Sequence, residues 1–218
     1  MDALAKVTKN GSGLKELQLE QSEQLDEPFI NNISTIVARS ELRDLTIYTK
    51  DEVGRVRILE SIQWAHLCML RIWVKPGTFE TTVMRDLVNS VKKTSGKVAL
   101  VDFRFYSDCP HDADDPLSMP LGYPLQAFIA SLSLEGLVLE VAMTMEQMLS
   151  LFRLADFSRL KGIALWAKGF DSVKVSAIMD GLQHATKLKT LKLIRAIVTD
   201  EQKERTKANG VTLRTDWY

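Results

Sequence analysis

The chain has 218 residues, of which 45% are hydrophobic and 26% are charged, as in ordinary globular domains. Its 28 basic and 28 acidic side chains cancel, which argues against a nucleic-acid partner and against attraction to anionic membranes. No apolar run approaches the roughly 18 residues of a membrane span. Residues 1–10 lack the apolar core of a secretory signal, and the two cysteines predict no disulfide framework. We therefore expect an intracellular, cytoplasmic protein, with a nuclear location left open.

One short hydrophobic phrase, apolar-x-x-apolar-x-apolar, recurs along the chain. The copies are Leu14/Leu17/Leu19, Leu42/Leu45/Ile47, Leu67/Leu70/Ile72, Val98/Val101/Phe103, Leu134/Leu137/Leu139, Leu160/Ile163/Leu165, Leu188/Leu191/Leu193 and a weaker Ala208/Val211/Leu213. Apolar residues two apart point to the same side of an extended chain, so each copy predicts a strand. Recurrence every 20 to 36 residues indicates stacked supersecondary units.

The segments around these phrases predict helices. Residues 2–10 are expected to be the closing helix of a repeat whose strand is missing. Further helices are expected to start after Asp26-Glu27-Pro28, Asp51, Thr78, Thr144, Asp171-Ser172 and Thr199. Gln147 and Gln202 complete capping boxes with Thr144 and Thr199. Each unit is therefore strand, turn, helix, turn.

Two arrangements of such units are open, a doubly wound sheet and a solenoid. A doubly wound sheet has helices on both faces and needs strands that are continuously apolar. Here apolar and polar residues alternate sharply, as in Leu17-Gln18-Leu19-Glu20. One face of the sheet is therefore expected to be open to solvent, which favours a solenoid with right-handed crossovers.

The phrase, its period and the intervening helices resemble leucine-rich-repeat proteins of the ribonuclease-inhibitor-like or F-box-associated type, over residues 14–218. The resemblance implies an α/β solenoid, a curved horseshoe with parallel strands on the concave face and helices on the convex face. It implies a single domain, 1–218, of about eight irregular repeats with an insertion at 107–127. The family's asparagine or cysteine after the strand is absent, for example at Ser22 and Lys50. The two ends suggest the C-terminal part of a longer repeat protein.

The resemblance also implies that ligands bind to the concave sheet. The side chains expected there as a protein-binding site are Tyr48, Arg71, Trp73, Asp102, Arg104, Glu140 and Trp166. Tyrosine, tryptophan and arginine are enriched at binding hot spots. The alternative is that the rings pack against a neighbouring strand or under a loop.

The insertion carries four aspartates with Cys109 and His111, all potential metal ligands. Their spacing matches neither a zinc pair nor a calcium loop, so a solvated surface loop is the simpler interpretation, and contact with a partner is left open. No phosphate loop, nucleophile elbow or metalloprotease motif occurs. We expect no enzymatic activity and no cofactor.

The sequence thus favours a non-catalytic module for protein–protein recognition or scaffolding, of the kind that serves as the substrate-recognition segment of an F-box-type protein. The alternative is a structural or degenerate repeat fragment with no binding role of its own. The partner is expected to be another protein, and neither nucleic acid nor a membrane. The sequence does not predict an oligomeric state.

Overall fold

The computed structural model describes residues 4–9, 13–20, 26–48, 52–74, 80–93, 98–107, 126, 128–140, 145–166 and 170–215. The side chains of residues 4–9, 52, 74, 80–82, 84, 107 and 166 are outside this description. The chain divides into two compact units, Met1–Cys109 and Pro110–Tyr218, which are described in turn.

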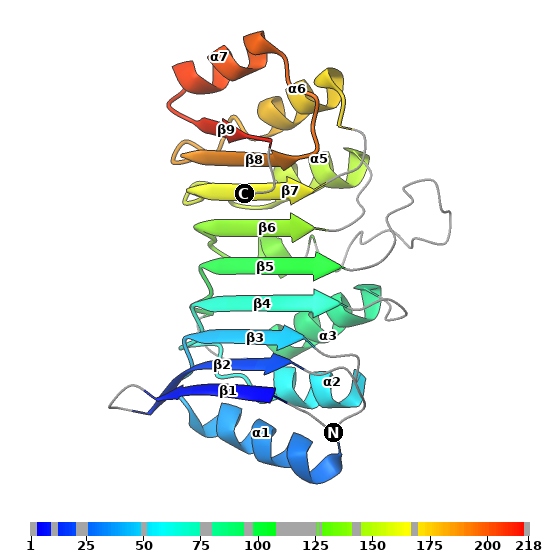
Figure 1. Cartoon of the computed structure of the whole chain (residues 1–218), viewed down its shortest axis with the longest axis vertical. Coiled ribbons are helices and arrows are strands. Elements are labelled where there is room, and N and C mark those ends of the chain that lie inside the picture. Colours follow the sequence, from blue (N-terminus) through cyan, green and yellow to red (C-terminus); the bar gives the residue numbers. More distant parts are fainter. Residues whose placement is uncertain are drawn as a thin grey trace. The chain divides into compact units, whose positions relative to one another are not determined.

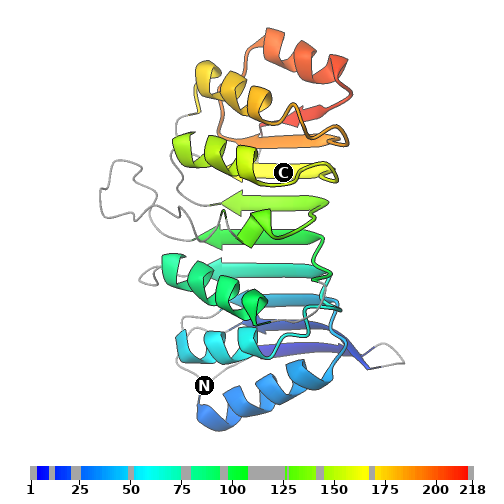
Figure 2. The same cartoon turned by 180° about the vertical axis from the view of Figure 1, so that it is seen from behind.

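Unit 1 is a five-stranded sheet with helices on one face (Figures 1 and 2). Its elements in chain order are β1 (Leu4–Lys9), β2 (Leu14–Glu20), α1 (Glu27–Arg39), β3 (Asp44–Tyr48), α2 (Glu52–Glu60), β4 (Met69–Val74), α3 (Glu80–Lys92) and β5 (Asp102–Ser107). Strands β2 to β5 are parallel and neighbour one another in chain order. Each helix is the crossover that two parallel strands require.

The expected helix at residues 2–10 is wrong. Leu4–Lys9 is strand β1, which pairs antiparallel with β2, Leu4 lying opposite Glu20 and Lys9 opposite Leu14. Gly13 precedes β2 with φ of 109°, a conformation that glycine adopts without strain. The chain therefore enters the parallel series through a hairpin.

The helix layer of unit 1 combines an expected cap with polar contacts that the sequence did not indicate. The Asp26 side chain accepts a hydrogen bond from the Phe29 backbone N–H at 2.8 Å and so caps α1. Between α2 and α3, the guanidinium of Arg55 lies 3.6 Å from the carboxylate of Asp86. Arg55 is 2% exposed and the Asp86 side chain 11%. An ion pair is thus enclosed between two helices.

Unit 2 repeats the same plan with four parallel strands. Its elements are β6 (Gly136–Glu140), α5 (Met145–Leu154), β7 (Gly162–Trp166), α6 (Ser172–Gly181), β8 (Thr190–Ile194), α7 (Asp200–Ala208) and β9 (Thr212–Arg214). The helices again lie on one face of the strands (Figure 2). Phe128 and Ile129, in a short helical segment before β6, are buried in its core.

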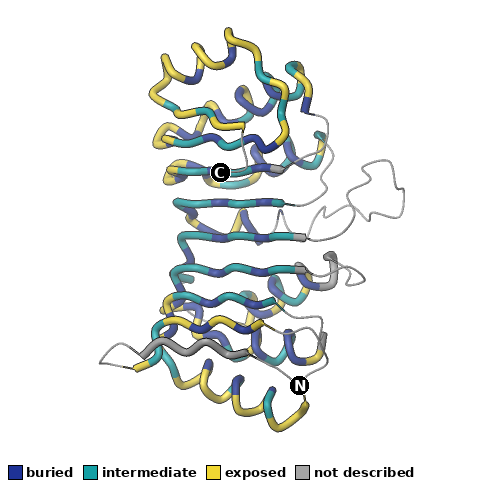
Figure 3. The backbone as a smooth tube through the Cα atoms, viewed as in Figure 1, coloured by how far each residue is buried: buried dark blue, intermediate teal, exposed yellow. Residues whose placement is uncertain are grey.

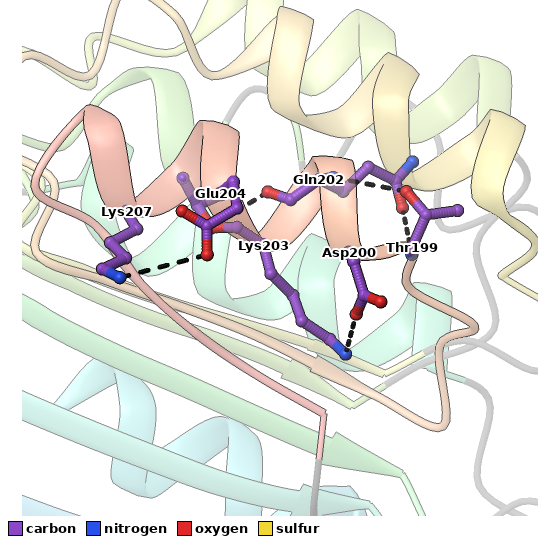
Figure 4. Close-up of polar contacts among 7 residues, drawn as sticks. Thr199, Asp200, Gln202, Lys203, Glu204 and Lys207 are labelled. Atoms are coloured by element: carbon purple, nitrogen blue, oxygen red, sulfur yellow. Dashed lines mark hydrogen bonds and ion pairs between the residues drawn. The ribbon is translucent and has the colours of Figure 1, made fainter.

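Helix α7 is polar and docks through polar side chains. The capping box at Thr199 and Gln202 is present as expected (Figure 4). The Gln202 amide also donates to the Ser172 carbonyl at 2.6 Å and to the Ser176 hydroxyl at 2.8 Å, which ties α7 to α6. Gln202 and Thr206 are buried, whereas the Lys203–Asp200 and Lys207–Glu204 pairs are exposed (Figure 4).

Buried and half-buried residues alternate along the strands, as the phrase predicted (Figure 3). In β3, for example, Leu45 and Ile47 face the helices and are at most 1% exposed, while Thr46 and Tyr48 on the other side are half-buried. Burial of the apolar set on one face fixes the register of each strand.

At β5 the phrase begins two residues later than the sequence suggested. Phe103 pairs with Leu70 and Phe105 with Ile72, and both phenylalanines are fully buried. Leu100 is 2% exposed and is the first residue of the phrase as the structure has it. The last copy is shifted in the same way, because Leu213 pairs with Leu191 and not with Leu193.

The expected α/β repeat architecture, with parallel strands and helices on one side, is confirmed within each unit. The single domain spanning 1–218 and the horseshoe curvature stay predictions. None of the described helices combines the length and apolar character needed to cross a bilayer.

Candidate functional site

The side chains on the face of the unit 1 sheet opposite the helices form three rows, because β2 to β5 pair in unbroken register. The carboxylate row is Glu16, Asp44, Met69 and Asp102; the arginine row is Gln18, Thr46, Arg71 and Arg104; the aromatic row is Glu20, Tyr48, Trp73 and Tyr106. Neighbouring members of a row lie about 4.8 Å apart, the spacing of strands in a sheet. We call the three rows together the row surface.

The three aromatic members of the aromatic row form a continuous series of rings in contact. The centroids of Tyr48 and Trp73 are 6.0 Å apart with planes at 74°, an edge-to-face contact. The centroids of Trp73 and Tyr106 are 3.9 Å apart with planes at 11°, so these rings are stacked. All three residues are half-buried. The rings therefore cover part of one another's surface and leave the rest accessible.

Arg104 is fixed beside this series by Asp102 of the same strand. Its Nε and Nη2 atoms donate to Oδ1 and Oδ2 of Asp102, each at 3.0 Å. This bidentate hydrogen bond is the main reason that the pKa of Arg104 is raised above its ordinary value. In the neighbouring strand, Arg71 donates to the Thr46 hydroxyl at 3.4 Å. The guanidinium of Arg104 is therefore oriented before any partner binds, whereas that of Arg71 is held by a longer hydrogen bond.

Asp44 lies in the carboxylate row, with Glu16 on the neighbouring strand β2 and Met69 on β4. Partial burial raises the pKa of its carboxyl, the charges of Glu16 and Asp102 raise it further, and Arg71 lowers it. Burial is the first cause of this shift, and the attraction of Arg71 acts against it more strongly than the repulsion of either neighbouring carboxylate raises it.

The corresponding face of unit 2 has different chemistry. Its rows are Gly136, Gly162, Thr190 and Thr212; Val138, Ala164, Lys192 and Arg214; and Glu140, Trp166 and Ile194. Glycine and threonine make up the first row, the second row combines Val138 and Ala164 with the cations Lys192 and Arg214, and Ile194 is 7% exposed. A preformed series of rings like that of unit 1 is not found among the side chains that the structure describes in this unit.

The seven residues proposed from the sequence fall into two groups. Tyr48, Arg71, Trp73, Asp102 and Arg104 come together on the row surface. Glu140 and Trp166 pair with each other at the ends of β6 and β7 in unit 2. Glu140 is half-buried, and the Trp166 side chain is not described. A binding role for either group stays a prediction.

Sequence reasoning missed Tyr106. The two-residue shift at β5 placed Arg104 beside Trp73, whereas the register pairs Trp73 with Tyr106 and Arg71 with Arg104. A second reading of the same stretch, Leu100-x-x-Phe103-x-Phe105, carries the signal, since it contains two phenylalanines as core residues.

The acidic insertion offers no structural test of metal binding, because residues 108–125, including Cys109 and His111, lie outside the described part of the chain. Among the residues that are described, no group of three or more His, Cys, Asp or Glu side chains could hold a metal ion.

No protein-family model matches the sequence, and no curated protein matches it. Among solved structures, the chain is similar to a crystal structure of a Bacteroides fragilis protein, with a TM-score of 0.50 and 14% sequence identity. The similarity covers 86% of this chain and 59% of that one, so the match spans less than two thirds of the Bacteroides protein. At this identity the likeness concerns the fold alone.

Proposed function

We propose that the chain is a leucine-rich-repeat-type solenoid, of the ribonuclease-inhibitor-like or F-box-associated kind, that recognises another protein without catalysis. The row surface of unit 1 is its contact face. Recognition of this type uses the strand face that the convex helices leave uncovered, and α1, α2 and α3 all lie on the other face (Figure 2).

The observation that carries the proposal is the Tyr48–Trp73–Tyr106 series beside the fixed Arg104 fork. Aromatic and arginine side chains supply most of the affinity of protein interfaces. Rings that already contact one another and an arginine that already has its orientation lose little conformational entropy on binding. Half-burial leaves these groups accessible to a partner.

The test is affinity capture from a lysate of the source cells with the wild-type chain and a Tyr48→Ala/Trp73→Ala/Tyr106→Ala variant. A matched control, Lys192→Ala/Arg214→Ala, alters the equivalent face of unit 2. Far-UV circular dichroism and thermal melting must show that both variants are folded. We expect the row-surface variant to lose a captured protein that the control retains.

If the row-surface variant retains the captured protein, the contact lies outside this surface. If the wild-type chain captures no protein, the alternative of a structural repeat fragment without a binding role gains support.

A further inference from the structure

We infer that the occupant of the row surface is an extended segment of the partner protein that places a basic side chain over β2 and β3 and an apolar side chain, three residues along, on the stacked rings of β4 and β5. This inference rests on the proposed function and adds the chemistry of the partner. It follows from the uneven charge of the surface and from the spacing of its strands.

The β2 and β3 end of the surface is acidic. Its described side chains include three carboxylates, Glu16, Glu20 and Asp44, and none of the six row members from these strands is a cation. The nearest described cation on the same face is Arg71 of β4, which reaches back to Thr46. On the other flank, the backbone register places Lys6 of β1 opposite Gln18. Arg43 also lowers the pKa of the Asp44 carboxyl, whereas Glu20 is exposed at the end of β2 and pairs with Tyr48.

A basic side chain from a partner fits this end in two ways. It complements the carboxylates of Glu20 and Asp44. It can also lie against the ring of Tyr48, which pairs with Glu20 on one side and Trp73 on the other. A cation within about 6 Å of such a ring is attracted by its electron-rich face.

The β4 and β5 end is different, because its charges are largely satisfied within the chain. Arg104 is bound by Asp102 through two hydrogen bonds of 3.0 Å. The remaining feature is the Trp73–Tyr106 stack, with ring planes only 11° apart. Flat aromatic surfaces of this kind accept proline and aliphatic side chains of extended peptides.

The strand spacing fixes the separation between the two contacts. The midpoints of the pairs β2/β3 and β4/β5 are two strand spacings apart, about 10 Å. A polyproline II segment advances about 3.1 Å per residue with three residues per turn, so residues i and i+3 point the same way about 9 Å apart. A basic residue followed three positions later by an apolar one therefore matches both ends.

The probe is the peptide acetyl-Gly-Lys-Pro-Pro-Leu-Pro-Gly-amide, compared with the same peptide carrying Glu in place of Lys. Binding to the full-length protein is followed at millimolar peptide by the amide and tryptophan indole signals of ¹⁵N-labelled protein, with the Trp73 indole assigned from Trp73→Phe. We expect the lysine peptide to shift the Trp73 indole and the glutamate peptide to leave it unmoved.

Glu20→Gln/Asp44→Asn is expected to weaken binding of the lysine peptide about three- to tenfold, while Lys192→Gln on the unit 2 face leaves it unchanged. Equal shifts by both peptides, or no shift at Trp73, would overturn the inference. If the captured protein still depends on the aromatic row but binds the Glu20→Gln/Asp44→Asn variant normally, the inference fails and the proposed function stands. Loss of dependence on the aromatic row would instead refute the proposed function.

Discussion

The open face of unit 1 and the corresponding face of unit 2 are each built from parallel strands in register but carry different side chains. In unit 1 the rows contain carboxylates, arginines and a series of rings, whereas in unit 2 one row consists of glycine and threonine and another combines Val138 and Ala164 with two cations. Strand residues alternate between the two faces of a sheet, so the buried positions maintain the fold while the alternate positions vary independently. A repeat scaffold can therefore confine binding chemistry to a part of its length.

The helix layers differ in a similar way. Unit 1 encloses the Arg55–Asp86 ion pair between α2 and α3. In unit 2, α5 and α6 approach so closely that a Cβ atom on Gly181 would lie 2.7 Å from Cδ2 of Phe152. An ion pair thus joins adjacent helices in unit 1, and close packing joins them in unit 2. Four predictions compare the two units.

The largest effect is expected from Asp86→Ala in unit 1. It leaves the buried guanidinium of Arg55 without its carboxylate, which should lower the free energy of unfolding by about 3–5 kcal/mol. Urea unfolding followed by far-UV circular dichroism measures the change. The matched control is Arg55→Met/Asp86→Leu, which removes both charges and should be close to neutral. A loss below about 1 kcal/mol for Asp86→Ala would show that the pair is not effectively buried.

In unit 2 the equivalent test is Gly181→Ala. The new methyl group would press on the ring of Phe152, itself 4% exposed, and overpacking of this kind costs about 1–3 kcal/mol. The control is Gly162→Ala on the open face, where nothing lies within 4 Å of the added atom and the change should stay within about 0.5 kcal/mol. Equal effects at the two glycines would contradict the close approach of α5 and α6.

Loss of a helix cap should have a smaller effect. Thr199→Ala removes one partner of the α7 capping box and should cost about 1 kcal/mol, while Thr199→Ser keeps the hydroxyl and should retain most of the stability. Asp26→Ala at α1 of unit 1 gives the comparison, since there the cap is one carboxylate. Thermal denaturation of the three variants ranks them, and equal melting of the alanine and serine variants would contradict the cap.

The smallest effect is expected from Asp44→Asn, and it should depend on pH. The pKa of the Asp44 carboxyl is raised on folding, so its ionised form destabilises the folded state. Below the ordinary pKa of 3.8 the carboxyl is protonated in both states and the penalty is absent. The penalty grows as the pH rises through the folded-state pKa. Asp44→Asn should therefore stabilise unit 1 at pH 7, by about 0.5 kcal/mol or less, and lose this advantage near pH 3.

The row surface could be predicted from the sequence only in part. The phrase identified β2 to β4 and their open face correctly, because alternation along a strand determines which side chains share a face. At β5, Val98-x-x-Val101-x-Phe103 and Leu100-x-x-Phe103-x-Phe105 both satisfy the phrase. A shift of two residues leaves each side chain on the same face of the sheet but moves it to another row. Arg104 was therefore assigned to the correct face but beside Trp73, whereas it pairs with Arg71.

Other features depend on contacts that a periodic pattern does not record. Residues 2–10 were expected to form a helix, whereas Leu4–Lys9 is a strand because it pairs antiparallel with β2. Arg55 interrupts the apolar pattern of its helix, and its burial goes with the ion pair to Asp86 of α3. Long-range pairing of this kind is set by the packing of whole elements.

The parallel stack of Trp73 and Tyr106 also gives unit 1 an optical signature. Two aromatic chromophores with centroids 3.9 Å apart couple electronically, so their near-ultraviolet circular dichroism depends on the integrity of β4 and β5. The contribution of this pair, taken as the difference between the spectra of the wild-type and Trp73→Phe proteins, reports on unit 1, while backbone ellipticity reports on both units. Coincidence of the two unfolding curves would mark cooperative unfolding of the chain, and their separation would mark two units that unfold independently.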